Sequence, residues 1–282
     1  MYSYGLPLLF ALFVWWLSTG LVLYAIGRPR SKHWQYMVVM TVLAGFALYA
    51  LSVTCTDTSV SGAYCAFTSA IVVWAWHEMS FLTGIVTGPR VTQCPGRGRV
   101  VENMPAPFMP AVQSVIYHEF AIVATAAAIY AIAGSGENTT GLWTFVILWL
   151  MRLSAKLNVY LGVRNLTEEF LPDHLTYLTS YFCRRPMNGL FPVAVTLSTA
   201  VATLLIVQAY AAETPFDAAS WTFLAMLMSL AVLEHWFLVI PLPAANLWSW
   251  GLKSRSRRPN SEGPGPSDHS GKLPSIAGVL AG

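Results

Sequence analysis

Charged residues are scarce in this 282-residue chain, in which Asp, Glu, Lys and Arg together make up 10% of the sequence. A soluble domain carries about 25% charged residues. Hydrophobic residues make up 55%, and the mean hydropathy is +0.54. This composition excludes an ordinary soluble domain and indicates a chain that lies mostly within a lipid bilayer. We expect no nucleic-acid partner.

Cysteine is scarce as well, and no two of the cysteines form a C-x-x-C pair. The four cysteines are Cys55, Cys65, Cys94 and Cys183. Their spacing gives no sign of a disulfide framework or a zinc site, so structural or incidental thiols are the favoured interpretation. The sequence also lacks a phosphate-binding glycine loop and any internal repeat, which removes the usual signals of a nucleotide-binding or repeat protein.

Apolar stretches long enough to cross a bilayer occur seven times along the chain. We therefore predict an all-α integral membrane protein with a bundle of seven transmembrane helices. The predicted spans are residues 5–26, 35–53, 61–86, 108–133, 142–163, 188–211 and 218–240. Residues 1–252 would form this transmembrane domain. Residues 253–282, rich in Ser, Pro, Gly and Arg, would form a disordered basic cytoplasmic tail.

The positions of Lys and Arg predict the orientation of the chain. Fourteen of the 16 lie in the tail or in alternate loops, those after the first, third and fifth spans. The N-terminus and the loops 54–60, 134–141 and 212–217 contain none. Because basic loops stay in the cytoplasm, we predict seven crossings, an outside N-terminus and a cytoplasmic C-terminus. The basic loop 164–187 also contains acids, aromatics and leucines, so we expect it to pack against the bundle.

Histidine and acidic residues occur side by side within the apolar stretches. The pairs are His77-Glu78, His118-Glu119 and Glu234-His235, while His174 follows Asp173 and lies near Glu168 and Glu169. The predicted topology places all of them in the cytoplasmic half of the bilayer or at its inner face. An ionisable residue at membrane depth costs roughly 2.5–3.5 kcal/mol on insertion scales, so its presence there indicates a function or a partner.

Two cations in the fifth predicted span, Arg152 and Lys156, are natural partners for these acids. They lie four residues apart and therefore on one face of a helix. In the simplest interpretation they neutralise Glu78, Glu119 or Glu234 within a buried ion-pair network. If the protein is an enzyme, they could instead bind an anionic group of its substrate, such as a porphyrin propionate.

Two further interpretations of the cluster involve a cofactor. Imidazole and carboxylate together suit Fe, Mn or Zn, so His77, His118, His174 and His235 could be metal ligands, assisted by the acids named above. The Glu-x-x-His motif of di-iron bundles is absent. Alternatively, one histidine could be the axial ligand of a bound tetrapyrrole, with Trp74 and Trp76 lining a flat pocket.

Four sequence strings resemble the PuhE family, whose members are regarded as assembly proteins of photosynthetic complexes in phototrophic bacteria. The strings are ALFVWWLSTG (11–20), AWHEMSFLTGIVTGPR (75–90), LWLMRLSAKLNVYLGVRNLTEEFLPDHLTYLTSYF (148–182) and AVLEHWFLVIPLP (231–243). The resemblance covers roughly residues 8–250. All the ionisable residues singled out above fall within these strings except His118 and Glu119. The family brings no established catalytic residues.

The resemblance implies a multi-pass protein of the bacterial inner membrane, cytoplasmic or intracytoplasmic. Its implied role is assembly of the reaction centre and light-harvesting complex, or supply of bacteriochlorophyll. The implied partners are subunits of those complexes or proteins of the bacteriochlorophyll pathway. The alternative hypothesis is a metal-dependent membrane oxidoreductase, such as a di-iron enzyme, that acts on a tetrapyrrole or another lipid-soluble substrate.

Overall fold

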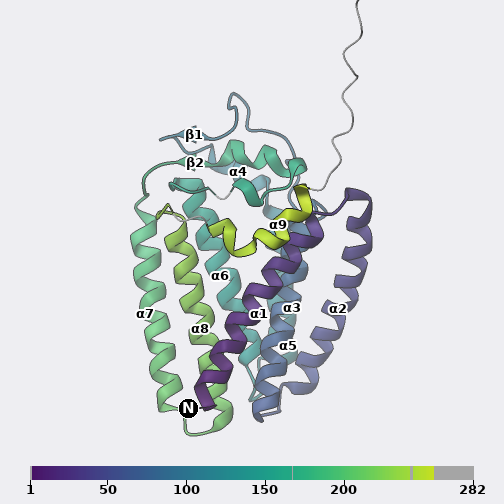
Figure 1. Cartoon of the computed structure of the whole chain (residues 1–282), viewed down its shortest axis with the longest axis vertical. Helices are drawn as coiled ribbons and strands as arrows, with labels where there is room; N and C mark the ends of the chain where they lie inside the picture. The colour runs from purple at the N-terminus through teal and green to yellow at the C-terminus, as the bar shows by residue number, and fades with distance from the viewer. Residues whose placement is uncertain (1, 167, 242–243, 257–282) are drawn as a thin grey trace, which may run out of the picture.

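The computed structural model describes residues 2–166, 168–241 and 244–256, and the chain is mostly helical over them (Figure 1). The predicted tail beyond Ser256 and the side chain of Glu169 lie outside what is described. The long helices are α1 (Tyr2–Ile26), α2 (His33–Thr54), α3 (Val60–Leu82), α5 (Ile116–Ala133), α6 (Thr140–Leu161), α7 (Leu190–Ala211) and α8 (Pro215–Phe237). Short elements are η1 (Arg30–Lys32), β1 (Val101–Glu102), α4 (Phe108–Gln113), η2 (Glu168–Phe170), η3 (Asp173–Tyr181), β2 (Cys183–Arg184), η4 (Ala244–Trp248) and α9 (Ser249–Ser256).

Six of the long helices are long and apolar enough to cross a membrane: α1, α2, α5, α6, α7 and α8. This supports an all-α membrane protein. The remaining long helix, α3, has 23 residues and packs against α1, α2, α6 and α8 in the same bundle. Its interior polar residues, such as Ser69, His77 and Glu78, lower its hydropathy. Seven crossings and the outside N-terminus therefore remain predictions.

The predicted third and fourth spans require correction. Helix α3 ends at Leu82, not at residue 86, and the span 108–133 is not one helix but is broken at Ser114 and Val115. The cause is the chain that follows α3: the Thr87 carbonyl accepts a hydrogen bond from His118 N–H at 2.9 Å, where an unbroken helix would use Ser114. Gly88 permits this approach, because a Cβ there would lie 2.1 Å from the Gln113 oxygen.

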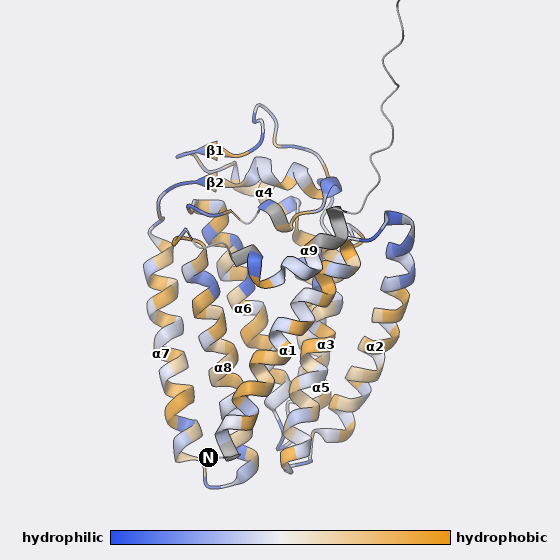
Figure 2. Cartoon of the chain, in the orientation of Figure 1, coloured by the Kyte–Doolittle hydropathy of each residue, from blue (hydrophilic) through white to orange (hydrophobic). Residues whose placement is uncertain are grey.

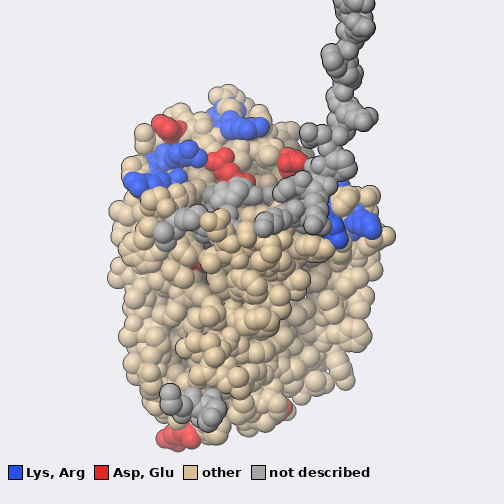
Figure 3. Space-filling view, viewed as in Figure 1, with Lys and Arg blue, Asp and Glu red and all other residues tan. Residues whose placement is uncertain are grey.

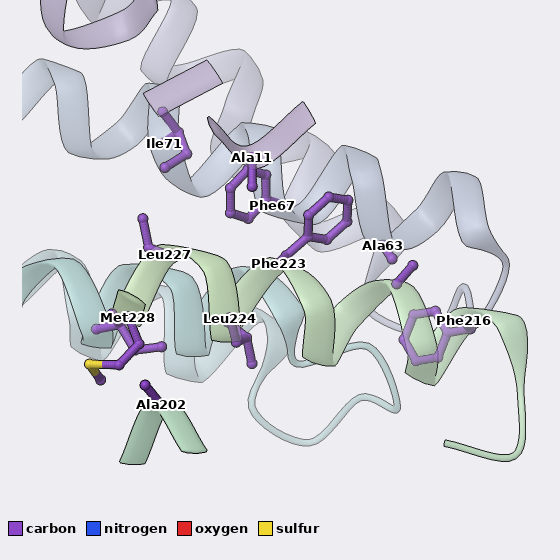
Figure 4. Packing of buried hydrophobic residues seen from close by; sticks show 12 residues of the cluster. Ala11, Ala63, Phe67, Ile71, Ala202, Phe216, Phe223, Leu224, Leu227 and Met228 are labelled. Atoms are coloured by element: carbon purple, nitrogen blue, oxygen red, sulfur yellow. The ribbon is translucent and has the colours of Figure 1, made fainter. Parts of the chain in front are cut away.

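A central apolar core joins α1, α3, α6, α7 and α8 (Figure 4). The rings of Phe67 and Phe223, both fully buried, stack at 4.6 Å with an interplanar angle of 14°. Alanines on neighbouring helices, such as Ala11 and Ala219, allow the backbones to come close. This packed core separates the polar cluster described below from the opposite end of the bundle.

The loops between α3 and α4 and between α6 and α7 form a cap over one end of the bundle (Figure 1). β1 and β2 pair in parallel, with Val101 opposite Cys183, and the Tyr181 hydroxyl donates to the Thr92 carbonyl at 2.9 Å. Residues of η3, including Leu175, are buried. The prediction that loop 164–187 packs against the bundle is confirmed. On the face seen in Figure 3, Lys and Arg gather at this end.

The last described segment, η4 and α9, crosses the bundle beside the upper part of α1 (Figure 1). The Trp248 indole donates to the Trp16 carbonyl at 3.0 Å, and the Trp16 indole donates to the Leu247 carbonyl at 2.9 Å. A Cβ on Gly20 would lie 2.0 Å from the Trp250 ring. A glycine at this position of α1 therefore lets the indole lie directly on the helix backbone.

Candidate functional site

Helix α6 carries two cations that each contact an acid on a different helix. The Arg152 Nη2 lies 3.0 Å from Glu78 Oε2 on α3, and the Lys156 Nζ lies 2.6 Å from Glu119 Oε1 on α5. The four-residue spacing places both on one side of α6, as predicted. Figure 2 shows hydrophilic segments on α6 and α8 near the end of the bundle that carries α9. The polar cluster therefore links three helices at one level.

His118 lies between the Lys156–Glu119 pair and His77, the buried histidine of α3. Its Nε2 donates to the His77 carbonyl at 3.2 Å, since a carbonyl can only accept. Its Nδ1 then accepts from Lys156 Nζ at 3.3 Å. The rings of the two histidines lie 6.1 Å apart. Both ring nitrogens of His118 are thus occupied by the protein itself.

His77 is fully buried and surrounded by side chains of its own bundle. Its Nε2 lies 3.0 Å from Thr125 Oγ1 on α5, and its Nδ1 is buried without a hydrogen-bond partner. The rings of Trp76 and Phe145 pack against it, with centroids 5.0 and 5.8 Å away. Because His77 is fully buried, neither of its ring nitrogens can be reached by the metal of a macrocycle, so His77 does not fit the role of an axial tetrapyrrole ligand.

The two residues of the third pair, Glu234 and His235, point in different directions from α8. His235 is buried, and its Nδ1 donates to the Ala231 carbonyl at 2.9 Å while its Nε2 lies 2.9 Å from Ser154 Oγ. Glu234 is exposed, and its Oε1 accepts a hydrogen bond from the Trp15 indole at 3.0 Å. Its carboxylate is close enough to Arg152 and Glu78 to interact with both electrostatically. Glu234 thus joins the cluster, while His235 does not.

His174 lies apart from the cluster, in η3 of the cap. Its ring centroid is 6.4 Å from that of His33, whose Nε2 donates to the carbonyls of Ile26 and Arg28 at the end of α1. Burial, followed by the charge of Arg30 and by His33, holds the pKa of His174 below its ordinary value. His174 also contacts the carbonyls of Leu82 and Thr83 at the end of α3. Its position indicates a role in fixing the cap.

The remaining predicted acid with a described side chain, Glu168, pairs with Arg184 at 2.9 Å within the cap. Across residues 2–166, 168–241 and 244–256, no three His, Cys, Asp or Glu side chains converge as a metal site would require. The ring nitrogens of His118 and His235 are taken up by hydrogen bonds within the protein, and His174 lies apart in the cap. The donor set does not fit the predicted metal centre, and we derive no chemistry through one.

Sequence reasoning missed several residues that complete the site: Thr125, Ser154, Trp15 and His33. Thr125 follows His118 by seven residues and so lies on the same face of α5, which was a detectable signal. Ser154 lies two residues from Arg152, on another face of α6. Trp15 is 219 residues from Glu234 in the chain, and no local pattern connects them.

Fold and cluster together define an all-α membrane protein with a network of ion pairs and hydrogen bonds near one end of its helix bundle. The chain belongs to the family described as "Protein of unknown function (DUF3623)", whose model matches residues 1–259. A relative from Rhodobacter capsulatus is 38% identical over 247 residues, which cover 86% of this chain and 89% of the relative. That protein is titled "Uncharacterized 30.4 kDa protein in puhA 5'region". No solved structure matches.

Proposed function

We propose that this protein is an integral membrane factor for assembly of the bacterial photosynthetic apparatus. It would act on the reaction centre and light-harvesting complex or on the supply of bacteriochlorophyll, in the cytoplasmic or intracytoplasmic membrane. The observation that carries the proposal is the relative whose printed title places it in the puhA 5′ region. The resemblance of four long sequence strings to the PuhE family supports the same role.

The interior of the bundle supports a binding or scaffolding role over transport. The polar cluster of Glu78, Glu119, Arg152, Lys156 and Glu234 ends at the apolar core around Phe67 and Phe223. A path for ions or protons would need polar groups or water through that layer. We therefore infer that the cluster acts at the end of the bundle that bears the basic cap, where the protein would bind partners and ligands.

The test is deletion of the gene in its phototrophic host, followed by complementation with the wild-type chain. We expect the deletion strain to lose near-infrared absorbance from assembled complexes, and the wild-type chain to restore it. A tagged wild-type chain should also co-purify with a subunit of the complex or with a bacteriochlorophyll enzyme. Unchanged pigment and complexes in the deletion strain would refute the proposal.

Two variants make complementation informative about the site. Arg152→Met should restore less absorbance than wild type, because it removes a cation of the cluster. Leu150→Met, on the exposed side of the same helix, should restore it fully. Immunoblots must show equal amounts of both variants in the membrane, so that loss of function is not loss of protein. Equal complementation by both variants would place the function away from the cluster.

A further inference from the structure

Arg152 has more hydrogen-bond donors than the protein uses. A guanidinium carries five N–H groups. In the part of the chain that the structure describes, Nη2 alone has a hydrogen-bond partner, Glu78 Oε2, while Nε is buried without one. The side chain is 41% exposed even though Arg152 lies in the middle of α6. Lys156, by contrast, is held by Glu119 and His118 and has 22% of its side chain exposed.

Unused donors at membrane depth need an acceptor. Hydrocarbon offers none, and each unsatisfied polar group there costs several kcal/mol. Since Arg152 is partly exposed, a molecule from outside the bundle can reach it. Glu78 Oε1, next to the guanidinium, is also buried without a partner. The accessible part of the guanidinium therefore offers donors to a polar group of such a molecule, whereas the buried Nε and Glu78 Oε1 lie out of its reach.

The surrounding charges decide which acceptor fits. Glu78, Glu119 and Glu234 supply three carboxylates, whereas Arg152 and Lys156 supply two cations. An anionic head group would add another negative charge beside Glu78 and Glu234. A carbonyl oxygen accepts from a guanidinium without that repulsion. We propose that Arg152 binds the carbonyl group of an uncharged, lipid-soluble molecule that enters from the membrane. This extends the proposed function by naming a class of ligand.

The probe is a benzophenone bearing a long alkyl chain, which is lipid-soluble and whose own carbonyl is photoreactive. The purified full-length protein is irradiated with it in detergent micelles, and the labelled peptides are identified by mass spectrometry. We expect label on the peptide that contains Arg152, and a loss of about fivefold or more in Arg152→Lys, which keeps a cation for Glu78 but loses the planar fork. Leu150→Val should label like wild type.

A double variant, Arg152→Leu with Glu78→Leu, guards against a folding defect because it removes both members of the pair together. It should also lose label while eluting as a single species in size-exclusion chromatography. Methyl palmitate, an uncharged ester, should compete with the probe, and palmitate should not. The inference would be overturned if the Arg152 variants were labelled as strongly as wild type, or if palmitate competed as well as the ester. The assay contains no photosynthetic partner, so its failure is distinct from failure of the deletion test.

Discussion

The Lys156 ammonium lies 2.6 Å from the Glu119 carboxylate, and the pair joins α6 to α5 directly beside the break before α5. Phe81 covers the ammonium, with its ring centroid 5.4 Å away. About a fifth of each charged side chain is exposed, so the pair is largely desolvated. Loss of one partner from such a pair strands the other charge in an apolar bundle.

Replacement of Lys156 by Met should therefore destabilise the protein by about 3 kcal/mol, the lower end of the range for breaking a buried pair. The double variant Lys156→Met with Glu119→Leu should recover much of this loss, because it leaves no unpaired charge. Thermal unfolding in detergent micelles measures both. Arg184→Ala is the control, since its pair with Glu168 is 50% and 35% exposed and should be worth less than about 1 kcal/mol. Equal effects of Lys156→Met and Arg184→Ala would contradict the burial argument.

Gly20→Ala should loosen the contact between α1 and α9. The added Cβ would lie 2.0 Å from the Trp250 ring, which must move away. Overpacking of this kind costs about 1–3 kcal/mol, and here the cost falls on the docking of one short helix. We expect faster proteolysis within residues 244–256, with unchanged cleavage elsewhere. Gly45→Ala is the matched control, because a Cβ added there would have nothing within 4 Å. Similar proteolysis of the two variants would show that Gly20 is not a packing requirement.

The cap should become less stable in mild acid because of His174. Its pKa is lowered in the folded protein by burial, by Arg30 and by His33. In the unfolded segment the pKa of His174 has its ordinary value of 6.5, so the unfolded state binds a proton more readily. The free energy of unfolding of the cap therefore falls as the pH drops below 6.5. Hydrogen exchange of residues 173–181 should therefore speed up between about pH 7.5 and about pH 5.5, after correction for the intrinsic rate. His174→Gln should reduce this pH dependence. An unchanged slope would mean that other groups control the cap.

The sequence predicted the partners within the cluster, and its place near one end of the bundle, better than its individual contacts. Basic loops and apolar lengths placed Glu78, Glu119 and Glu234 near one end, and helical spacing placed Arg152 and Lys156 on one face. The pairing of each acid with a particular cation depends on how α3, α5 and α6 pack together. Sequence patterns do not reveal this packing. The apparent similarity of the three His–Glu pairs was misleading. Neighbours on a helix point about 100° apart, so His235 faces Ser154 while Glu234 faces Trp15.

The break between α4 and α5 was unpredictable for a related reason. The segment 108–133 is mostly apolar despite Gln113, Ser114 and the His118-Glu119 pair, and Pro110 lies where it could begin a helix. What ends α4 is the backbone after α3, which supplies the Thr87 carbonyl to His118 and an N–H from Arg90 to the Gln113 carbonyl at 3.3 Å. Any residue has a backbone N–H or carbonyl that can form such a tertiary hydrogen bond, so these bonds cannot be predicted from the periodic pattern of side chains.

Asn188, which no motif marked, should be among the most sensitive residues of the fold. Its Nδ2 is within hydrogen-bonding distance of the Asn158 carbonyl and side-chain oxygens and of the Gly162 carbonyl, at 2.9–3.1 Å. Its Oδ1 accepts from the N–H groups of Leu190 and Phe191 at the start of α7. One buried amide thus ties the end of α6 to the beginning of α7.

Asn188→Ala should lower the free energy of unfolding by about 1–3 kcal/mol, because it leaves buried backbone groups at both helix ends unsatisfied. Asn188→Asp separates the two halves of this role, since a carboxylate still caps α7 but cannot donate to α6. If the bonds to α6 matter, the Asp variant will be destabilised about as much as the Ala variant. If the cap on α7 dominates, Asp will unfold close to wild type in the same thermal assay. Stability of both variants equal to wild type would show that Asn188 does not hold the two helices together.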